Sequence, residues 1–257
     1  MKKRRCFNML INKIVLDLIG EIKKTDLWRV MPPAEKERLE EIIKFVGGQD
    51  IDKVREGKPV KPAIYQFKVT LKGIRPPIWR RFLIDNQMTF VELHDIIQIV
   101  MGWQNSHLYR FDTGDAYVEI QDDSFDFFPS SVETYDAQET QVGELITEEK
   151  QKCVYTYDFG DDWDHQLVLE KILPIDEKIT VPTCQKGKRA CPPEDCGGVY
   201  MYNEIQTALK GEDELDEGME EWLGEFDPEE FDLAFVNGVL EMYAAGEVIY
   251  GGNDEGE

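Results

Sequence analysis

The chain has 257 residues, of which 29 are Lys or Arg and 52 are Asp or Glu, so its formal net charge is −23. An apolar fraction of 42% supports a substantial core and argues against a wholly disordered chain. A charge this negative argues against binding of duplex nucleic acid or an anionic membrane over the whole surface.

The charge is unevenly distributed along the chain. Residues 1–62 carry 15 basic and 10 acidic side chains, residues 63–202 carry 13 and 24, and residues 203–257 carry 1 and 18. This asymmetry predicts a basic extension, a mildly acidic body and a strongly acidic end. The acidic end is interpreted either as solvated helix faces with a frayed tail or as a docking surface for a basic protein. The argument against nucleic acid weakens for residues 1–62.

Targeting signals are weak. The start, residues 1–5, is basic like the head of a signal peptide, but polar residues interrupt the stretch that follows and no cleavage site comes after it. No run approaches the roughly 20 apolar residues needed to cross a bilayer. Five cysteines, an odd number, without an export signal indicate reduced thiols. We therefore expect a cytoplasmic protein that does not bind membranes.

The N-terminal part predicts two helices, at 8–24 and 33–46, followed by a Gly- and Pro-containing linker. A domain boundary is placed there, so that 1–62 is a helical basic extension with a linker. Residues 63–245 are expected to form the main domain, and 246–257 an acidic disordered tail.

The main domain begins with strands. Alternating apolar and polar residues predict strands at 65–71 and 78–84. Thr89 and Glu92 form a capping-box pattern at the start of a helix that ends at Gly102. Short strands are expected near 107–111 and 116–121, followed by an acidic loop of about 25 residues.

A hairpin and a helical end complete the pattern. Residues 153–159 and 163–169 alternate on either side of a Gly-Asp-Asp turn, which predicts a hairpin. Residues 182–198 are expected to be an irregular loop, and helices follow at 201–210, 213–224 and 228–243. Strands followed by helices favour an α+β fold, an antiparallel sheet of hairpins packed with helices.

Several motifs occur together in one order. They are Gly73-Ile74-Arg75-Pro76-Pro77-Ile78-Trp79-Arg80-Arg81, Leu93-His94, Met101-Gly102-Trp103, Ser106-His107-Leu108, Tyr157-Asp158-Phe159-Gly160-Asp161-Asp162-Trp163 with His165, and Arg189-Ala190-Cys191-Pro192-Pro193-Glu194-Asp195-Cys196-Gly197-Gly198. Over about 63–240 the chain resembles the plasmid pRiA ORF-three-like family, whose members are also labelled insertion-element passenger proteins of TnpR type.

The resemblance implies a compact α+β domain and assigns no reaction. The TnpR label suggests a mobile element, but a serine recombinase needs a nucleophilic Ser among arginines that neutralise phosphate, and the acidic body has no such cluster. Family members often carry a second His where this chain has Tyr109 or Arg110, and another where it reads Glu212 to Asp216. Any family site that used those histidines is in doubt in this chain.

The clustered cysteines are the strongest candidate metal ligands in the sequence. Cys184, Cys191 and Cys196 lie in a Pro- and Gly-rich stretch, and thiolates are soft ligands that suit Zn²⁺. The spacing is not that of a CxxC knuckle, and a fourth ligand must come from elsewhere. His165 is the first choice and Cys153 the second. The alternatives are three buried or idle thiols, or redox chemistry at these cysteines.

Other polar residues are candidate binding groups. Four carboxylates, those of Asp158, Asp161, Asp162 and Asp164, surround the hairpin turn and either hold Mg²⁺ or Ca²⁺ or shape the turn. Arg80 and Arg81 point to opposite faces of a strand, where either could bind an anion or form an internal ion pair. Trp103 and Trp163 complete the predicted binding set.

The three histidines have different expected roles. His94 is placed on the polar face of its helix and is expected to face solvent. His107 is interpreted as a ligand, a base or a structural residue. His165 shares a strand face with Trp163 and is expected to be buried.

Three functional hypotheses follow. The first is an intracellular binding or adaptor module, zinc-stapled in one version, that meets a protein partner through its acidic surface. The second is a metal-dependent hydrolase built around His107, His165 and the Asp cluster. The third is contact with nucleic acid through residues 1–62 alone. No catalytic signature is present, neither a P-loop nor GxGxxG, so the first is favoured and an enzyme is not expected.

Overall fold

The computed structural model describes residues 60–120, 132–215 and 217–247, and in the N-terminal part residues 23, 24, 28, 31, 32 and 36. The chain divides into two compact units, Met1–Lys58 and Pro59–Glu257. The helices expected at 8–24 and 33–46 and the tail at 246–257 lie almost wholly outside the described residues. The sheet and the helices that pack with it belong to the second unit.

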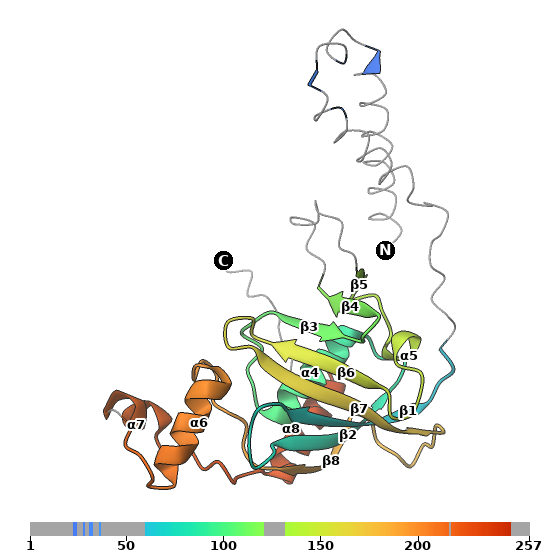
Figure 1. The fold of residues 1–257 in the computed structure, drawn as a ribbon. Coiled ribbons are helices and arrows are strands. Elements are labelled where there is room, and N and C mark those ends of the chain that lie inside the picture. The colour runs from blue at the N-terminus through green and yellow to red at the C-terminus, as the bar shows by residue number, and fades with distance from the viewer. Residues whose placement is uncertain are drawn as a thin grey trace. The chain divides into compact units, whose positions relative to one another are not determined.

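An eight-stranded sheet is the centre of this unit (Figure 1). Its order is β5-β4-β3-β6-β7-β1-β2-β8, and all neighbouring pairs are antiparallel except β4 and β5. Together with the helices, this sheet confirms the α+β fold. The strands are β1 (Ile64–Leu71), β2 (Trp79–Asp85), β3 (Tyr109–Asp112), β4 (Ala116–Glu119), β5 (Glu133–Asp136), β6 (Lys152–Tyr157), β7 (Trp163–Leu173) and β8 (Thr183–Lys188).

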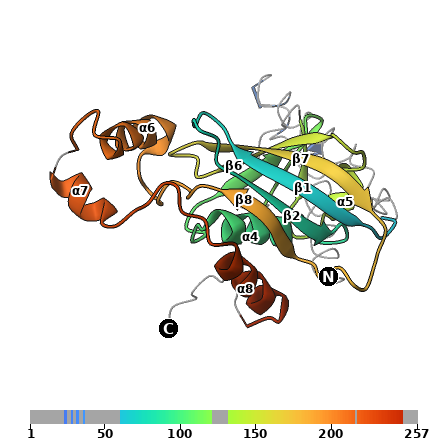
Figure 2. The same cartoon turned by 90° about the horizontal axis from the view of Figure 1, so that it is seen from below.

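The two faces of the sheet differ. Alternate residues of β1, such as Phe67 and Val69, and of β7, such as Leu167 and Leu169, are buried on the face that carries helix α4 (Phe90–Met101). Helix α8 (Leu233–Ala244) lies on the same side (Figure 2). Among the described elements, no helix covers the central strands on the opposite face, which we call the outer face.

Helix α4 begins as its sequence predicts. The Thr89 hydroxyl accepts a hydrogen bond from the Glu92 backbone N–H at 3.3 Å, and the Glu92 carboxylate accepts one from the Thr89 N–H at 2.7 Å. This capping box satisfies two of the N–H groups that lack a partner at a helix start. Gly102 ends the helix in the left-handed region, with φ of 93°. The helix position is therefore encoded locally.

Three features differ from the expected elements. The stretch expected to be an irregular loop contains the edge strand β8, which pairs with β2. The acidic loop contains β5 and the short helix α5 (Val142–Leu145). The last helix was expected to start at Pro228, but α8 begins after Asp232, whose carboxylate accepts hydrogen bonds from the N–H groups of Ala234 and Phe235.

Two more helices, α6 (Gly198–Leu209) and α7 (Glu217–Leu223), lie beyond one end of the sheet (Figures 1 and 2). Helix α6 is anchored by Tyr202 and Ile205, which are fully buried. Helix α7 has no buried residue, and its Trp222 side chain is 49% exposed. In the part of the chain that the structure describes, no helix is both long and apolar enough to cross a membrane.

Candidate metal centre

Three segments that are far apart in the sequence meet at one end of the sheet. They are the loop after α4, the turn between β6 and β7, and the loop that precedes α6. The Trp103 indole N–H donates to the Pro192 carbonyl at 2.9 Å, and the Gly197 N–H donates to the Asp161 carboxylate at 3.1 Å. A Cβ on Gly198 would lie 2.8 Å from the Asp161 carbonyl oxygen, so glycine allows this close approach.

His107 lies at the point where the segments meet, among three carboxylates. Its Nε2 atom is 2.9 Å from Asp195 Oδ1, 3.7 Å from Asp158 Oδ2 and 3.7 Å from Glu194 Oε2. One ligand atom each from His107, Asp158 and Asp195 lies within 4.8 Å of the other two. Within the described ranges, no other group of three or more His, Cys, Asp or Glu side chains meets that condition.

The cluster is open to solvent on one side. The side chain of Asp195 is 70% exposed, whereas those of Asp158 and Glu194 are 12% and 14% exposed. His107 lies between these extremes. Water can therefore reach the group from the side of Asp195, while the other carboxylates are held against the protein.

Hydrogen bonds hold the less exposed carboxylates in place. Asp158 Oδ1 accepts from the Gly160 N–H at 2.8 Å, and this leaves Oδ2 directed toward His107. Glu194 Oε1 accepts from the Gln104 N–H at 2.7 Å and from the Tyr157 hydroxyl at 3.0 Å. These bonds orient the carboxylates without using all of their oxygen lone pairs.

Two of the carboxylates occupy left-handed backbone positions. Asp158 and Asp195 each have φ of 57°. Asp tolerates this region better than most residues, but it is sparsely populated, and such conformations concentrate at functional sites. The chain thus holds both acidic residues of the three-donor group in a constrained geometry.

The donor set determines what the arrangement can do. Imidazole nitrogen suits Zn²⁺ and other first-row transition ions, and carboxylate oxygen binds these ions as well as Mn²⁺ and Mg²⁺. Three protein donors with an open side resemble a site that completes its coordination with water. The cluster therefore matches the chemistry of a divalent cation site.

The structure does not place three or more of the nominated ligands Cys184, Cys191, Cys196 and His165 within 4.8 Å of one another. Cys184 lies on β8, where its Sγ is 3.6 Å from the Arg81 carbonyl oxygen. Cys191 and Cys196 are buried in the loop before α6, and burial raises the pKa of each thiol to about 12. Cys153, the reserve ligand, is buried on β6, and all four of these cysteines are free thiols. The described side chains that do meet this distance condition lie at His107 instead.

His165 belongs to the core of the sheet. Its ring is fully buried, Nδ1 is 3.3 Å from the Tyr155 carbonyl oxygen, and Nε2 has no hydrogen-bond partner. The ring packs edge-on against Trp103, which also packs against Trp163. The two indoles, predicted as binding groups, are each 1% exposed. Both therefore contact protein rather than solvent.

The Asp residues of the hairpin turn have separate surroundings. Asp158 joins His107, and Asp161 bonds to Gly197. Asp162 is exposed, with φ of 53°, and its N–H donates to the Asp158 carbonyl at 2.7 Å. These three carboxylates therefore form part of the turn, and only one of them reaches the cluster.

The two arginines of β2 do point to opposite faces. Arg80 is buried, and it donates to the Val100 carbonyl at 2.6 Å and stacks on the Phe231 ring at 4.1 Å. Arg81 forms a two-pronged ion pair with Glu170 on the outer face, at 2.6 and 2.9 Å. Arg80, predicted as a binding residue, is thus distant from solvent and satisfied by backbone carbonyls.

His94 was expected to face solvent, but it is 1% exposed. Its ring nitrogens bond to the Tyr155 hydroxyl at 2.7 Å and to Asn105 Oδ1 at 2.6 Å, and the ring stacks on Tyr109. The helical pattern alone misplaces this residue, because β3 and β6 bury α4 on its polar side as well.

Sequence reasoning missed Glu194, Asp195 and Tyr157 as members of the cluster. The acidic pair stands between Cys191 and Cys196, in a stretch whose thiols are the more conspicuous ligands. A His motif and an acidic Pro-rich motif in one chain are a usable signal, although a sequence separation of 88 positions hides the proximity of His107 and Asp195.

The comparisons agree with this fold. Residues 63–234 match the model of a protein family described as "Plasmid pRiA4b ORF-3-like protein". The uncharacterized protein y4hQ of Sinorhizobium fredii is 32% identical over 148 residues, which are 57% of this chain and 73% of that protein. The crystal structure of a protein of unknown function, MM3350 from Methanosarcina mazei Go1, superimposes with a TM-score of 0.61 at 37% identity. That similarity covers 69% of this chain and 98% of the other. The chain belongs to the plasmid pRiA4b ORF-3-like protein family.

Proposed function

We propose that this domain is a divalent-cation-binding module whose ion is held by His107, Asp158 and Asp195. The observation that carries the proposal is the convergence of these three donors within 4.8 Å, on segments from three parts of the chain. Zinc is the first ion to test, because the set combines one imidazole with carboxylates.

An ion at this position would join the three segments. The loop after α4, the β6–β7 turn and the loop before α6 already share hydrogen bonds at Trp103 and Gly197. A bound cation would neutralise carboxylates that otherwise lie close together in a strongly acidic chain. Because an ion that binds the folded chain preferentially stabilises it, binding should raise the melting temperature.

A zinc titration of the full chain tests the proposal. We expect stoichiometric binding by calorimetry after chelator treatment, and a melting temperature that rises with zinc. Asp195→Asn removes a donor at an exposed position and should weaken binding about 10-fold or more. Asp162→Asn is the matched control, since Asp162 is an exposed carboxylate of the neighbouring turn outside the cluster. Equal zinc affinity in both variants would contradict the proposal.

A metal-dependent hydrolase is the second candidate. The exposure of Asp195 leaves a side from which water can enter, and Glu194 is fixed nearby as a potential general base. Glu194→Gln should then abolish zinc-stimulated hydrolysis of activated esters or phosphodiesters while leaving zinc affinity within about threefold. If the wild-type protein binds zinc but hydrolyses neither substrate class, the hydrolase proposal is contradicted and only the cation-binding module stands.

The acidic end is proposed as a docking surface for a basic protein in the cytoplasm. Support comes from α7, which buries none of its residues and carries Glu217, Glu220 and Glu221. The free cysteines agree with a reducing compartment. Salt-sensitive binding of a lysine-rich peptide, lost when these three glutamates are reversed to lysine, tests the surface.

A further inference from the structure

The outer face of the sheet carries a row of cations that the strand registers bring together. Lys186 on β8 pairs with Arg81 on β2, Arg81 pairs with Lys68 on β1, and Lys68 pairs with Val168 on β7. Val168 in turn pairs with Lys152 on β6. Directly paired residues of antiparallel strands project from the same face. With strands about 4.8 Å apart, the row is about 19 Å long.

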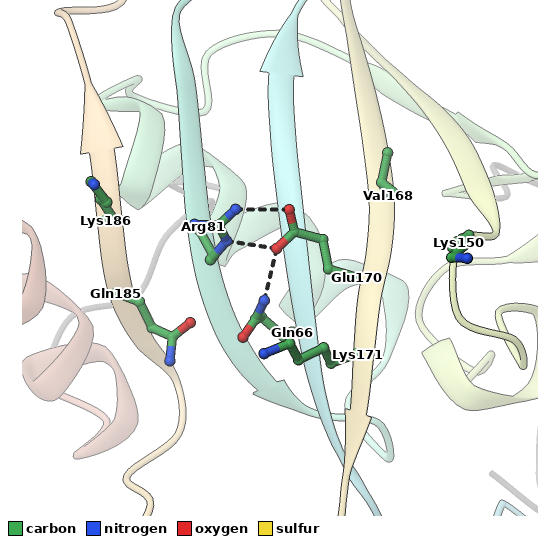
Figure 3. Close-up of a pocket in the computed structure, with 8 residues that line it drawn as sticks. All are labelled: Gln66, Arg81, Lys150, Val168, Glu170, Lys171, Gln185 and Lys186. Atoms are coloured by element: carbon green, nitrogen blue, oxygen red, sulfur yellow. Dashed lines mark hydrogen bonds and ion pairs between the residues drawn. The ribbon is translucent and has the colours of Figure 1, made fainter.

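This face also forms a shallow depression of about 680 Å³ (Figure 3). Besides Arg81 and Lys186, its lining includes Lys150, Lys171 and one acidic residue, Glu170. Glu170 is already paired with Arg81 and accepts from the Gln66 amide at 2.7 Å. In a chain with a net charge of −23, the depression is therefore locally positive.

The lysines of this region remain available to a ligand. Among the described residues, no carboxylate forms an ion pair with Lys150, Lys152, Lys171 or Lys186, and all four are exposed. Lys68 lies 5.1 Å from the centre of the Trp79 ring, and Arg81 lies 5.5 Å from it. The row thus combines free ammonium groups with a half-buried aromatic ring at its edge.

We propose that this outer face binds single-stranded nucleic acid, with the backbone running across the strands along the row from Lys186 to Lys152. Single-stranded nucleic acids are bound by positive surfaces that follow the phosphates and by aromatic rings beside the bases. Trp79 is an aromatic ring of that kind at the edge of the row, and the exposed Gln185 amide lies beside it. The site is separate from the candidate metal centre and does not depend on it.

Other partners fit this face less well. Duplex DNA is read mainly by an element that enters a groove, and the outer face, an open sheet surface with a shallow depression, offers none. An extended anionic membrane would be repelled by the net negative charge of the whole chain. A single nucleic-acid strand bound along the row lies within about one Debye length of the lysines, so their attraction dominates. An acidic peptide could match the charge, but neither Trp79 nor a regular row of cations is required for it.

Fluorescence anisotropy with a labelled 20-nucleotide oligo-dT and the full chain tests the proposal. The row contains three lysines, Lys68, Lys152 and Lys186, and none of them is in an ion pair with a described carboxylate. The log of K should therefore fall with log salt with a slope of about −2, from about 0.7 per phosphate contact. The double substitution K152Q/K186Q should weaken binding by about 10- to 100-fold at 50 mM salt and reduce the slope by about 1.4. The control K178Q/K210Q removes two exposed lysines that lie outside both the row and residues 1–62.

The design separates this face from the basic residues 1–62, because binding through that segment would be unchanged in K152Q/K186Q. Both double variants must have the same melting temperature as the wild type, so that a loss of binding cannot be caused by a loss of folding. Affinity that falls in K152Q/K186Q and persists in K178Q/K210Q supports the proposal. Absence of binding, equal binding by both variants, or displacement of oligo-dT by polyglutamate at equal charge would overturn it.

Discussion

At the scale of single residues, two neighbours on α4 show how burial moves pKa values in opposite directions. Burial lowers the pKa of His94 from 6.5 to about 4 and raises the pKa of Asp95 from 3.8 to about 7. Each change favours the neutral form, since a buried charge loses its hydration. Asp95 shares its surroundings with Tyr243, whose hydroxyl lies 3.0 Å away, and with Tyr109 and Glu92. The buried side chains of His94 and Asp95 are thus both neutral near pH 5.

The two shifts have opposite effects on stability. Between pH 4 and 6.5 the unfolded chain holds the His94 proton and the folded chain does not, so His94 lowers stability as the pH falls. His165, with a pKa also lowered by burial to about 4, acts in the same window. Between pH 3.8 and 7 the folded chain holds the Asp95 proton and the unfolded chain does not, so Asp95 lowers stability as the pH rises.

The substitution Asp95→Asn should therefore stabilise the protein at high pH. Above pH 8 the wild type buries a carboxylate charge, and the amide removes it while it can still bond to Tyr243, a gain of roughly 3 kcal/mol. Near pH 4 the two proteins should be about equally stable. Urea unfolding at both pH values checks this, with the exposed Asp115→Asn as control. Destabilisation by Asp95→Asn at pH 8 would contradict the assignment.

At the scale of elements, the side-chain amide of Asn237 links α8 to the backbone of the edge strand β8. Asn237 Oδ1 accepts from the Cys184 N–H at 2.8 Å, and its Nδ2 donates to the Cys184 carbonyl at 3.0 Å. The side chain imitates a neighbouring strand and pairs backbone groups that an edge strand would leave exposed. Helix α8 thereby both covers and terminates the sheet.

The substitution Asn237→Ala should destabilise the domain by about 1–3 kcal/mol, because it leaves both backbone groups of Cys184 without partners. The Cys184 amide should also exchange faster with deuterium than in the wild type. Gly238→Ala, one position along, has the opposite expected sign. No atom lies within 4 Å of the point that the added methyl would occupy, so helix propensity should stabilise by about 0.5–1 kcal/mol. If Asn237→Ala and Gly238→Ala destabilise the domain by similar amounts, the effect of Asn237→Ala would reflect a general intolerance of α8 to substitution. The assignment of that effect to the Cys184 hydrogen bonds would then be contradicted.

The predictable parts of the fold are those that local pattern encodes. Alternation located β1, β2 and the β6–β7 hairpin, and the Thr89–Glu92 box located α4. Strand β8 was not predicted because its apolar-polar alternation is interrupted where its register with β2 shifts, beside Arg81 and Phe82. Its strand conformation depends on pairing with β2. The metal cluster was predicted only in part for a similar reason. His107 and Asp158 were nominated, but their proximity to Asp195 depends on contacts between distant segments.

At the scale of the whole molecule, charge and architecture divide the chain in similar places. The basic N-terminal part falls in one compact unit, and the sheet with its acidic helices falls in another. Within the second unit, the carboxylates of the candidate metal centre and the cations of the outer face occupy separate surfaces. An overall charge of −23 therefore conceals one locally positive face.

A chain that begins at residue 59 should fold independently. Because the sheet, its helices and the core lie in the second unit, we expect far-UV circular dichroism of a mixed α+β domain and a cooperative melt within about 3 °C of the full chain. The truncated chain is more acidic than the full chain, so its melting temperature should rise more between 20 and 300 mM salt. A non-cooperative melt would place essential contacts in residues 1–58.

The central claim is that His107, Asp158 and Asp195 hold a divalent cation. Its most direct test is an anomalous difference map from crystals grown with zinc, recorded on both sides of the zinc edge. We predict one strong peak about 2.0–2.2 Å from His107 Nε2 and from an oxygen of each carboxylate. A peak at Cys184, Cys191 or Cys196, or no peak at His107 in crystals with bound zinc elsewhere, would contradict the claim.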